Sequence, residues 1–265
     1  MDTPPQKNLC LVQLLKKFSS TATFERGLMK TSYQRVLLKL SGEQFEGQRD
    51  HGIDPEFLRW LSNEIKQATD HGVQIVIVVG GGNIIRGAAV AGNGIERTAG
   101  DYMGMLATII NGIALSNVLE SIGLQTRLMT RLRAESVAEP YIHRRALRHL
   151  DKGRIVIIGG GTGNPYVTTD TASVQAAVEL KCDVVLKATN VDGVYDRDPH
   201  EFKDAKRLTA VTLAEALANP DIKVMDKTAL AMAADNQLPI VVFNLLEPGN
   251  INRIISGENV GTIVS

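Results

Sequence analysis

Two glycine-rich turns are the segments of this chain best suited to chemistry, and each follows the end of a strongly apolar run. The first is Gly80-Gly81-Gly82-Asn83, after residues 74–79, and the second spans residues 159–164, after residues 154–158. A backbone without side chains brings its N–H groups close to a phosphate. One such turn after a strand is a weak indication of nucleotide binding. Two turns, with a Lys-x-Ser-Gly segment upstream and an acidic segment downstream, predict a site where two phosphorylated groups meet.

Basic side chains lie before and after the first turn. Lys39 and Gly42 stand where the first predicted strand gives way to a loop, so the lysine can offer a point charge to a phosphoryl group and the glycine lets the backbone approach it. Arg86 follows the glycine turn, and its forked guanidinium can bind the same oxyanion. The competing interpretations are a surface lysine before a turn and a surface arginine beside a structural turn.

Carboxylates mark two segments further along the chain. Asp101 begins a long apolar segment, where it either caps a helix or accepts both hydroxyls of a ribose. The segment 161–170 combines turn glycines, an amide, three threonine hydroxyls and a carboxylate. Because Asp170 would repel transferring phosphates, we expect it to hold lysine side chains in place and not to touch a nucleotide.

A second lysine ends a later apolar strand. Lys187 opens the segment 187–199, whose glycine, aromatic and carboxylate residues suit an adenosine site. We expect Lys187 to assist Lys39 in charge stabilisation, with Asp170 organising both. In the alternative interpretation, Lys187 only flanks the nucleotide pocket.

The elements that must position these segments alternate between strand and helix patterns from residue 33 onward. This alternation predicts an α/β fold, a three-layer αβα sandwich with a mostly parallel central sheet. Strands are expected at residues 35–40, 74–79, 125–129, 154–158, 184–187 and 240–243. Helices are expected from the capping Asp54 and the following Pro55 to about residue 72, over residues 100–122 as a buried helix, and from residue 169 to about 181.

Composition excludes several classes of function. The chain has 265 residues and 44% hydrophobic content, enough for one large domain with a sizeable core. Lys plus Arg and Asp plus Glu are balanced at 29 each, so no global positive field favours a nucleic-acid partner. Cys10 and Cys182 form no C-x-x-C pair, which favours a reducing compartment. No P-loop, dinucleotide fingerprint, protein-kinase set or metal-ligand spacing occurs in the sequence.

Residues 1–30 are expected to be an N-terminal extension outside the domain of residues 31–265. The apolar run at residues 10–15 is too short to cross a bilayer, and no clear cleavage pattern follows it. We therefore predict a cytoplasmic protein without a membrane partner. Three origins of the extension stay open: a disordered segment, an amphipathic segment, or a misassigned start with translation beginning at Met29.

Taken in order, these segments resemble bacterial uridylate kinases of the amino acid kinase superfamily. The resemblance covers residues 33–265 and includes the segment 223–226 near the C-terminus. Its motifs are Lys39-Leu40-Ser41-Gly42, Gly80-Gly81-Gly82-Asn83-x-x-Arg86-Gly87, Asp101-x-Met103-Gly104-Met105, Thr162-Gly163-Asn164-Pro165-x-x-Thr168-Thr169-Asp170 and Lys187-Ala188-Thr189-x-Val191-Asp192-Gly193-Val194-Tyr195.

The resemblance implies the amino acid kinase fold and reversible transfer of the ATP γ-phosphate to UMP, which gives UDP and ADP in pyrimidine nucleotide biosynthesis. Mg²⁺ would accompany the ATP, with no dedicated protein metal site. The N-terminal part of the domain would bind UMP and the C-terminal part ATP. Together, pattern and resemblance give the catalytic set Lys39, Arg86, Asp170 and Lys187. The resemblance implies ATP binding by Lys39, Leu40, Ser41, Gly42, Gly82, Arg86, Thr189, Tyr195 and Asp198. It implies UMP binding by Gly81, Asp101, Thr162, Gly163, Asn164, Pro165, Tyr166, Val167, Thr168 and Thr169, with Asp101 on the ribose.

Assembly and regulation follow from the resemblance alone, which implies a homohexamer activated by GTP and inhibited by UTP. Arg127, Arg131 and Arg133 form either a basic surface for an anionic effector or a solvated charge cluster. Two other functions stay open. One is an amino acid kinase acting on a carboxylate or carbamate, and the other is a non-catalytic storage or regulatory protein of the same fold.

Overall fold

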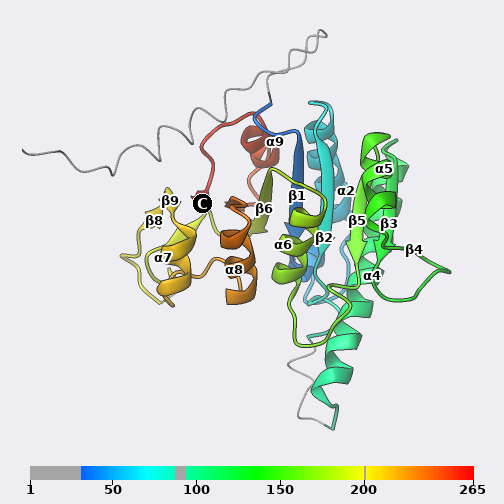
Figure 1. Ribbon diagram of the computed structural model, residues 1–265, viewed down its shortest axis with the longest axis horizontal. Coiled ribbons are helices and arrows are strands. Elements are labelled where there is room, and N and C mark those ends of the chain that lie inside the picture. The colour runs from blue at the N-terminus through cyan, green and yellow to red at the C-terminus, as the bar shows by residue number, and fades with distance from the viewer. Residues whose placement is uncertain (1–30, 87–93, 200) are drawn as a thin grey trace, which may run out of the picture.

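Strands and helices alternate around one central sheet in the computed structural model, which describes residues 31–86, 94–199 and 201–265 (Figure 1). The nine strands of this sheet run in the order β4-β3-β5-β2-β1-β6-β10-β11-β9, and every pair is parallel except β10 with β11. Their bounds are β1 Arg35–Leu40, β2 Gln74–Val79, β3 Thr126–Thr130, β4 Glu139–Pro140, β5 Ile155–Gly159, β6 Val184–Thr189, β9 Ala210–Val211, β10 Ile240–Asn244 and β11 Thr262–Val264. The predicted mostly parallel sheet is confirmed.

All six predicted strands are present. Most are short apolar runs buried on both faces of the sheet, and β3, with the sequence Thr-Arg-Leu-Met-Thr, is the most polar of them. The structure adds β4, β9 and β11, which are too short to show a pattern in the sequence. It also adds a separate antiparallel pair, β7 Val194–Tyr195 with β8 Arg207–Leu208.

Helices cover both faces of the sheet, which gives the three layers that the sequence predicts. One face carries α2 Pro55–Thr69, α4 Arg97–Ser121 and α9 Asn250–Ile255, and the other carries α5 His143–Asp151, α6 Thr169–Glu179, α7 Leu213–Ala218 and α8 Lys227–Asp235. Successive strand residues point to opposite faces. Leu38 and Leu40 of β1 therefore pack in the α2 layer, while Leu37 packs in the α6 layer.

Helix α2 begins as its sequence predicts. Asp54 accepts hydrogen bonds from the Glu56 and Phe57 amides at 2.9 and 3.4 Å, and Pro55 occupies the first helical position. The apolar residues at helical spacing face the core. Among them, Leu58, Leu61 and Ile65 are fully buried.

Helix α4 differs from its prediction in two ways. It begins at Arg97 after Glu96, so Asp101 lies inside the helix and is not its N-cap. It is also only half buried, because Tyr102, Met103, Leu106 and Ile110 are exposed. The segment is apolar on both faces, so its sequence could not distinguish a covered face from an open one. In length and composition α4 could span a membrane, but it packs against α2, β3 and β5 as a core helix does.

The predictions for residues 1–30, including a start at Met29, lie outside the described residues, as does Gly87 of the first turn.

Candidate active site

Two lysines from neighbouring strands form the centre of the site. Lys39 of β1 and Lys187 of β6 are direct partners in the parallel register, so both side chains leave the sheet at the same level. They lie on the α6 side, two residues beyond Leu37 and Val185 respectively. Lys39 is only 7% exposed, so the interpretation of it as a surface lysine is wrong.

Asp170, in the first turn of α6, lies between the two ammonium groups. Its Oδ1 is 2.9 Å from Lys39 Nζ, and its Oδ2 is 3.0 Å from Lys187 Nζ. Burial alone would raise the pKa of Asp170, but the two lysines outweigh burial and hold that pKa below its usual value. Burial lowers the pKa of Lys187, and the Lys39 charge adds to this lowering while Asp170 opposes it. The carboxylate therefore keeps two crowded cations together.

The charge balance of this cluster favours an anionic ligand. The two lysines and the one carboxylate that they contact together carry one net positive charge, and Asp226 acts on Lys187 without contacting it. The N-terminus of α6 adds to this field, because Asp170 belongs to its first turn and Thr168 is its N-cap. Helix N-termini with nearby lysines bind phosphate groups readily.

The first glycine turn lies beside the Lys39 segment. Gly80 N donates to Leu40 O at 2.8 Å, which continues the β1–β2 ladder past the end of the strands. Arg86 follows this turn at the surface and forms an ion pair with Glu43. The structure thus brings Lys39, Gly80 and Arg86 to the same edge of the sheet, where parallel sheets bind ligands.

The second glycine turn reaches the N-terminal part of α4. Tyr166 N donates to Asp101 Oδ2 at 2.9 Å, and Arg97 Nε donates to Asp101 Oδ1 at 2.9 Å. The Arg97 guanidinium lies 5.4 Å from the centre of the Tyr166 ring. Tyr166 has a φ of +64°, a left-handed conformation that is uncommon for a residue with a side chain and is concentrated at functional sites. The structure therefore places Asp101 next to the segment 162–169.

Three further predicted nucleotide residues, Thr189, Tyr195 and Asp198, lie at the end of β6 and after it. The hydroxyl of Thr189 lies 2.7 Å from Val191 O, and the Tyr195 hydroxyl donates to Asp192 Oδ1 at 2.5 Å. Asp198 forms an ion pair with Lys223 at 2.9 Å. The Asp198–Lys223 pair connects the segment after β6 to the loop that precedes α8.

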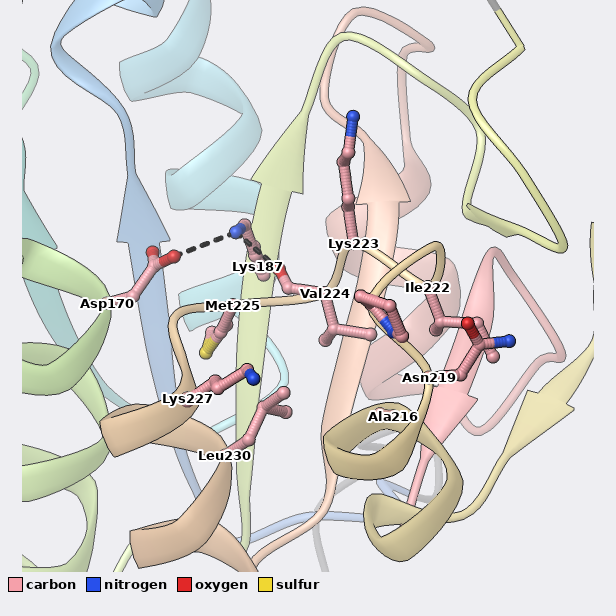
Figure 2. Close-up of a pocket in the computed structure, with 11 residues that line it drawn as sticks. Asp170, Lys187, Ala216, Asn219, Ile222, Lys223, Val224, Met225, Lys227 and Leu230 are labelled. Atoms are coloured by element: carbon pink, nitrogen blue, oxygen red, sulfur yellow. Dashed lines mark hydrogen bonds and ion pairs between the residues drawn. The ribbon is translucent and has the colours of Figure 1, made fainter. Parts of the chain in front are cut away.

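That loop contributes two residues that the sequence analysis did not assign to the site. Val224 O accepts a hydrogen bond from Lys187 Nζ at 2.5 Å (Figure 2). The Asp226 carboxylate caps α8 and accepts hydrogen bonds from the hydroxyls of Thr168 and Thr171, the latter at 2.9 Å. A backbone carbonyl leaves no trace in the sequence, but Asp226 before an apolar run is a recognisable helix cap.

A cavity of about 260 Å³ opens between this loop, α7 and the Asp170–Lys187 pair (Figure 2). Its apolar wall includes Ile222, Val224 and Leu230, and Lys223 and Lys227 add charge. Pockets of this kind, apolar with a few polar groups, are typical of nucleobase and cofactor sites.

The three arginines considered for an effector surface are not equivalent. Arg131 is largely buried, where it binds Glu179 at 2.6 Å and stacks on the Tyr141 ring at 4.3 Å. Arg127 lies 3.5 Å from Glu139. Arg131 therefore supports the fold next to the second turn, and the prediction of one basic cluster that includes it is wrong.

Comparison with known proteins places this geometry in a family. A sequence model of the amino acid kinase family matches residues 34–244. The chain belongs to the amino acid kinase family. Its fold, with Lys39 and Lys187 at the ligand edge of a parallel sheet, is the family fold that the sequence predicts.

Several solved structures of this family are similar over nearly their whole length. UMP kinase from Bacillus anthracis is 45% identical with a TM-score of 0.85, covering 88% of this chain and 96% of its own. UMP kinase from Ureaplasma parvum is 33% identical with a TM-score of 0.82, covering 88% and 98%. Uridylate kinase from Archaeoglobus fulgidus is 26% identical with a TM-score of 0.70, covering 87% and 99%.

Proposed function

We propose that this chain is a UMP kinase, a nucleoside monophosphate kinase that transfers the ATP γ-phosphate reversibly to UMP in pyrimidine nucleotide biosynthesis. The observation that carries the proposal is the bridge of Asp170 between Lys39 and Lys187, at the sheet edge where both glycine turns end. The similarity to three UMP or uridylate kinase structures supports the same reaction.

Catalysis in this proposal is positioning and charge neutralisation. Phosphoryl transfer passes through a transition state whose charge is spread over the equatorial oxygens, so little covalent help is needed. Lys39 and Lys187 neutralise that charge, and Asp170 fixes their direction without touching the phosphate. Arg86 leaves its surface pair with Glu43 to bind nucleotide phosphates from the open side.

The two nucleotides occupy opposite sides of the lysine pair. The UMP side is the N-terminal part of the domain together with the second glycine turn: Gly81, Asp101 on the ribose, and residues 162–169. The ATP side is the C-terminal part: the phosphates meet residues 39–42, Gly82 and Arg86, and Thr189, Tyr195 and Asp198 line the nucleoside. The cavity beside Val224 adds an apolar wall for the adenine. It belongs to the ATP side because its lining residue Lys223 forms an ion pair with Asp198.

Magnesium enters this scheme as part of the ATP substrate. In the part of the chain that the structure describes, no three His, Cys, Asp or Glu side chains gather as a metal site requires. Asp170, the carboxylate nearest the lysines, already binds both of them. Mg²⁺ commonly keeps several waters and binds through substrate phosphates, which suits such a site.

The deciding experiment is an assay of ADP release from ATP with UMP, CMP and small carboxylates as acceptors. We expect UMP-dependent ADP release that exceeds the release with every other acceptor. A carboxylate-dependent signal would favour another amino acid kinase activity, for which the Asp101 contact with the segment 162–169 has no evident use. Nucleotide binding without turnover would favour a storage or regulatory protein, against which the Lys39–Asp170–Lys187 cluster argues.

We also propose a cytoplasmic homohexamer activated by GTP and inhibited by UTP, as the resemblance implies. The exposed apolar residues Tyr102, Met103, Leu106 and Ile110 on α4 support self-association, since such a patch is unusual on a monomer surface. Light scattering of the purified protein tests the assembly. Rates with added GTP or UTP test the regulation.

A further inference from the structure

The pairing of β2 with β5 stops before the two glycine turns begin, so it does not connect the turns to each other. Strands β2 and β5 are neighbours, and their register ends at Val78 with Ile158. One residue further, β2 ends at Val79 and β5 ends at Gly159, and the chain continues into the two glycine turns. Some other element must therefore set the distance between them.

Helix α4 binds both turns with two side chains that lie three residues apart. Asn111 Nδ2 donates to Gly80 O at 2.8 Å and to Asn83 Oδ1 at 2.7 Å, so it holds the first turn. Thr108 Oγ1 accepts from Gly160 N at 2.7 Å, so it holds the second. Residues at this spacing share one face of a helix. One helical turn thus contacts both loops.

The burial of these two polar side chains indicates that they serve to bind the turns and not only to fill space. Thr108 and Asn111 are 2% and 0% exposed on an otherwise apolar helix face. A buried polar group is costly unless it is hydrogen-bonded. The Asn83 side chain returns a bond to Asn111 Oδ1 at 3.0 Å, and Thr108 donates to Met105 O at 2.7 Å. Apolar residues would fill the same space but would fix neither turn.

The glycines themselves also touch this helix. A Cβ on Gly81 would lie 2.7 Å from Gly104 O and 2.8 Å from the Ala107 Cβ, and a Cβ on Gly159 would lie 3.2 Å from the Ile109 Cα. From the sequence, the glycines are predicted to let the backbone come close to a phosphate. At Gly81, close packing on α4 also requires the absence of a side chain, and at Gly159 a side chain would fit only if α4 shifted slightly.

We propose that Thr108 and Asn111 are positioning residues that set the separation of the two glycine turns, and hence of the two nucleotides. The proposal rests on the proposed function for its kinetic consequences. Asp101, on the same helix, accepts a hydrogen bond from Tyr166 N just after the second turn, so α4 holds this turn and the segment that follows it. Because in-line transfer requires reacting atoms about 3–3.5 Å apart, a displacement of about 1 Å can cost about 100-fold in rate.

The experiment compares Thr108→Val, Thr108→Ser and Asn111→Ala with Leu115→Ala, a matched control. Leu115 is fully buried on α4 and belongs to the apolar core. Its truncation should destabilise the helix at least as much as loss of the Thr108 hydroxyl. All variants are assayed well below their unfolding temperatures.

We expect Thr108→Val to lower kcat/KM for UMP about tenfold while the KM for ATP stays within about twofold. Thr108→Ser keeps the hydroxyl and should restore the wild-type value. Asn111→Ala should lower kcat about tenfold. Equal losses in Leu115→Ala, or unchanged kinetics in Thr108→Val, would overturn the proposal.

Hydrogen–deuterium exchange gives a readout that does not need UMP kinase activity. Exchange in the segment 159–163 should accelerate in Thr108→Val and not in Thr108→Ser or Leu115→Ala. Unchanged exchange in Thr108→Val would refute the positioning role. An inactive wild-type protein would refute the proposed function only, since the exchange comparison would still decide the role of α4.

Discussion

Replacing Asp170 by asparagine tests the centre of the proposed mechanism. Asp170 binds Lys39 at 2.9 Å and Lys187 at 3.0 Å, and its side chain is only 16% exposed. Asparagine keeps the shape and one oxygen acceptor, but it presents an N–H₂ donor to the second ammonium group. The substitution therefore removes one of the two ion-pair contacts and leaves two cations without their counter-charge.

The size of the effect follows from these contacts. Removing one partner of a buried ion pair costs about 3–5 kcal/mol. Since about 1.36 kcal/mol corresponds to a tenfold change in rate, the full cost expressed in the transition state would be about 10²–10⁴ in kcat. Because asparagine retains one acceptor, we expect the lower end, a decrease of about 100-fold. Part of the cost should also appear as a lower free energy of unfolding.

The pH dependence of kcat distinguishes this mechanism from simple loss of fold. Burial lowers the pKa of Lys187, and the Asp170 charge opposes that lowering. Loss of the charge should move the alkaline decrease of kcat to lower pH. The double change Asp170→Asn with Lys187→Arg should remove this decrease, because a guanidinium stays protonated.

The assay is ADP release at saturating UMP and ATP over a range of pH, with urea unfolding of each variant. Asp235→Asn, at the exposed end of α8, serves as the control for a lost carboxylate. A kcat within about threefold of the wild type and an unmoved alkaline limb in Asp170→Asn would refute the reasoning.

Three further predictions concern neighbouring contacts. Burial would raise the pKa of Glu179, but Arg131 and Tyr141 hold this pKa below the usual 4.5. The stability that the Glu179 carboxylate contributes should therefore be complete above about pH 4.5 and lost as the pH falls through the native pKa. Urea unfolding should show a smaller loss of stability at acid pH in Glu179→Gln than in the wild type. Arg86→Ala should lower kcat/KM at least tenfold without changing the unfolding midpoint, because its pair with Glu43 is exposed and surface pairs contribute about 0–1 kcal/mol. Asp101→Asn should reduce the preference for UMP over dUMP, and an unchanged ratio of kcat/KM would remove it from ribose recognition.

The sequence predicted the longer strands and α2 well because their signals are local. A strand such as β5 is a continuous apolar run, and α2 carries both a cap and a proline at its first position. Strands of two or three residues, such as β4 and β11, have no pattern of their own and form only because a neighbouring strand offers free hydrogen-bonding groups. The open face of α4 was missed because both of its faces are apolar.

The site residues also divide into those that local sequence predicts and those that depend on the fold. Glycine turns and lysines at strand ends could be recognised locally, but the direct pairing of Lys39 with Lys187 depends on β1 lying next to β6, which chain order does not give. Thr108 and Asn111 did leave a trace, since they are two polar residues at helical spacing in an apolar segment. Their role could not be predicted from this pattern, because it depends on both glycine turns lying beside the same helix.

The ratio of two lysines to one carboxylate accounts for the position of Asp170. Without it, two buried ammonium groups would repel each other and favour loss of a proton, which would remove the charge that a phosphoryl group needs. A second carboxylate in direct contact with the two lysines would cancel the remaining positive charge and repel the phosphates. The Asp226 carboxylate, whose charge also acts on Lys187, instead caps α8 and accepts hydrogen bonds from Thr168 and Thr171. With one carboxylate between them, the repulsion between the two ammonium groups is offset, and the three groups keep a net positive charge. The same argument explains why Asp170 should not touch a nucleotide: its two oxygens are each occupied by a lysine, and its negative charge is useful only there.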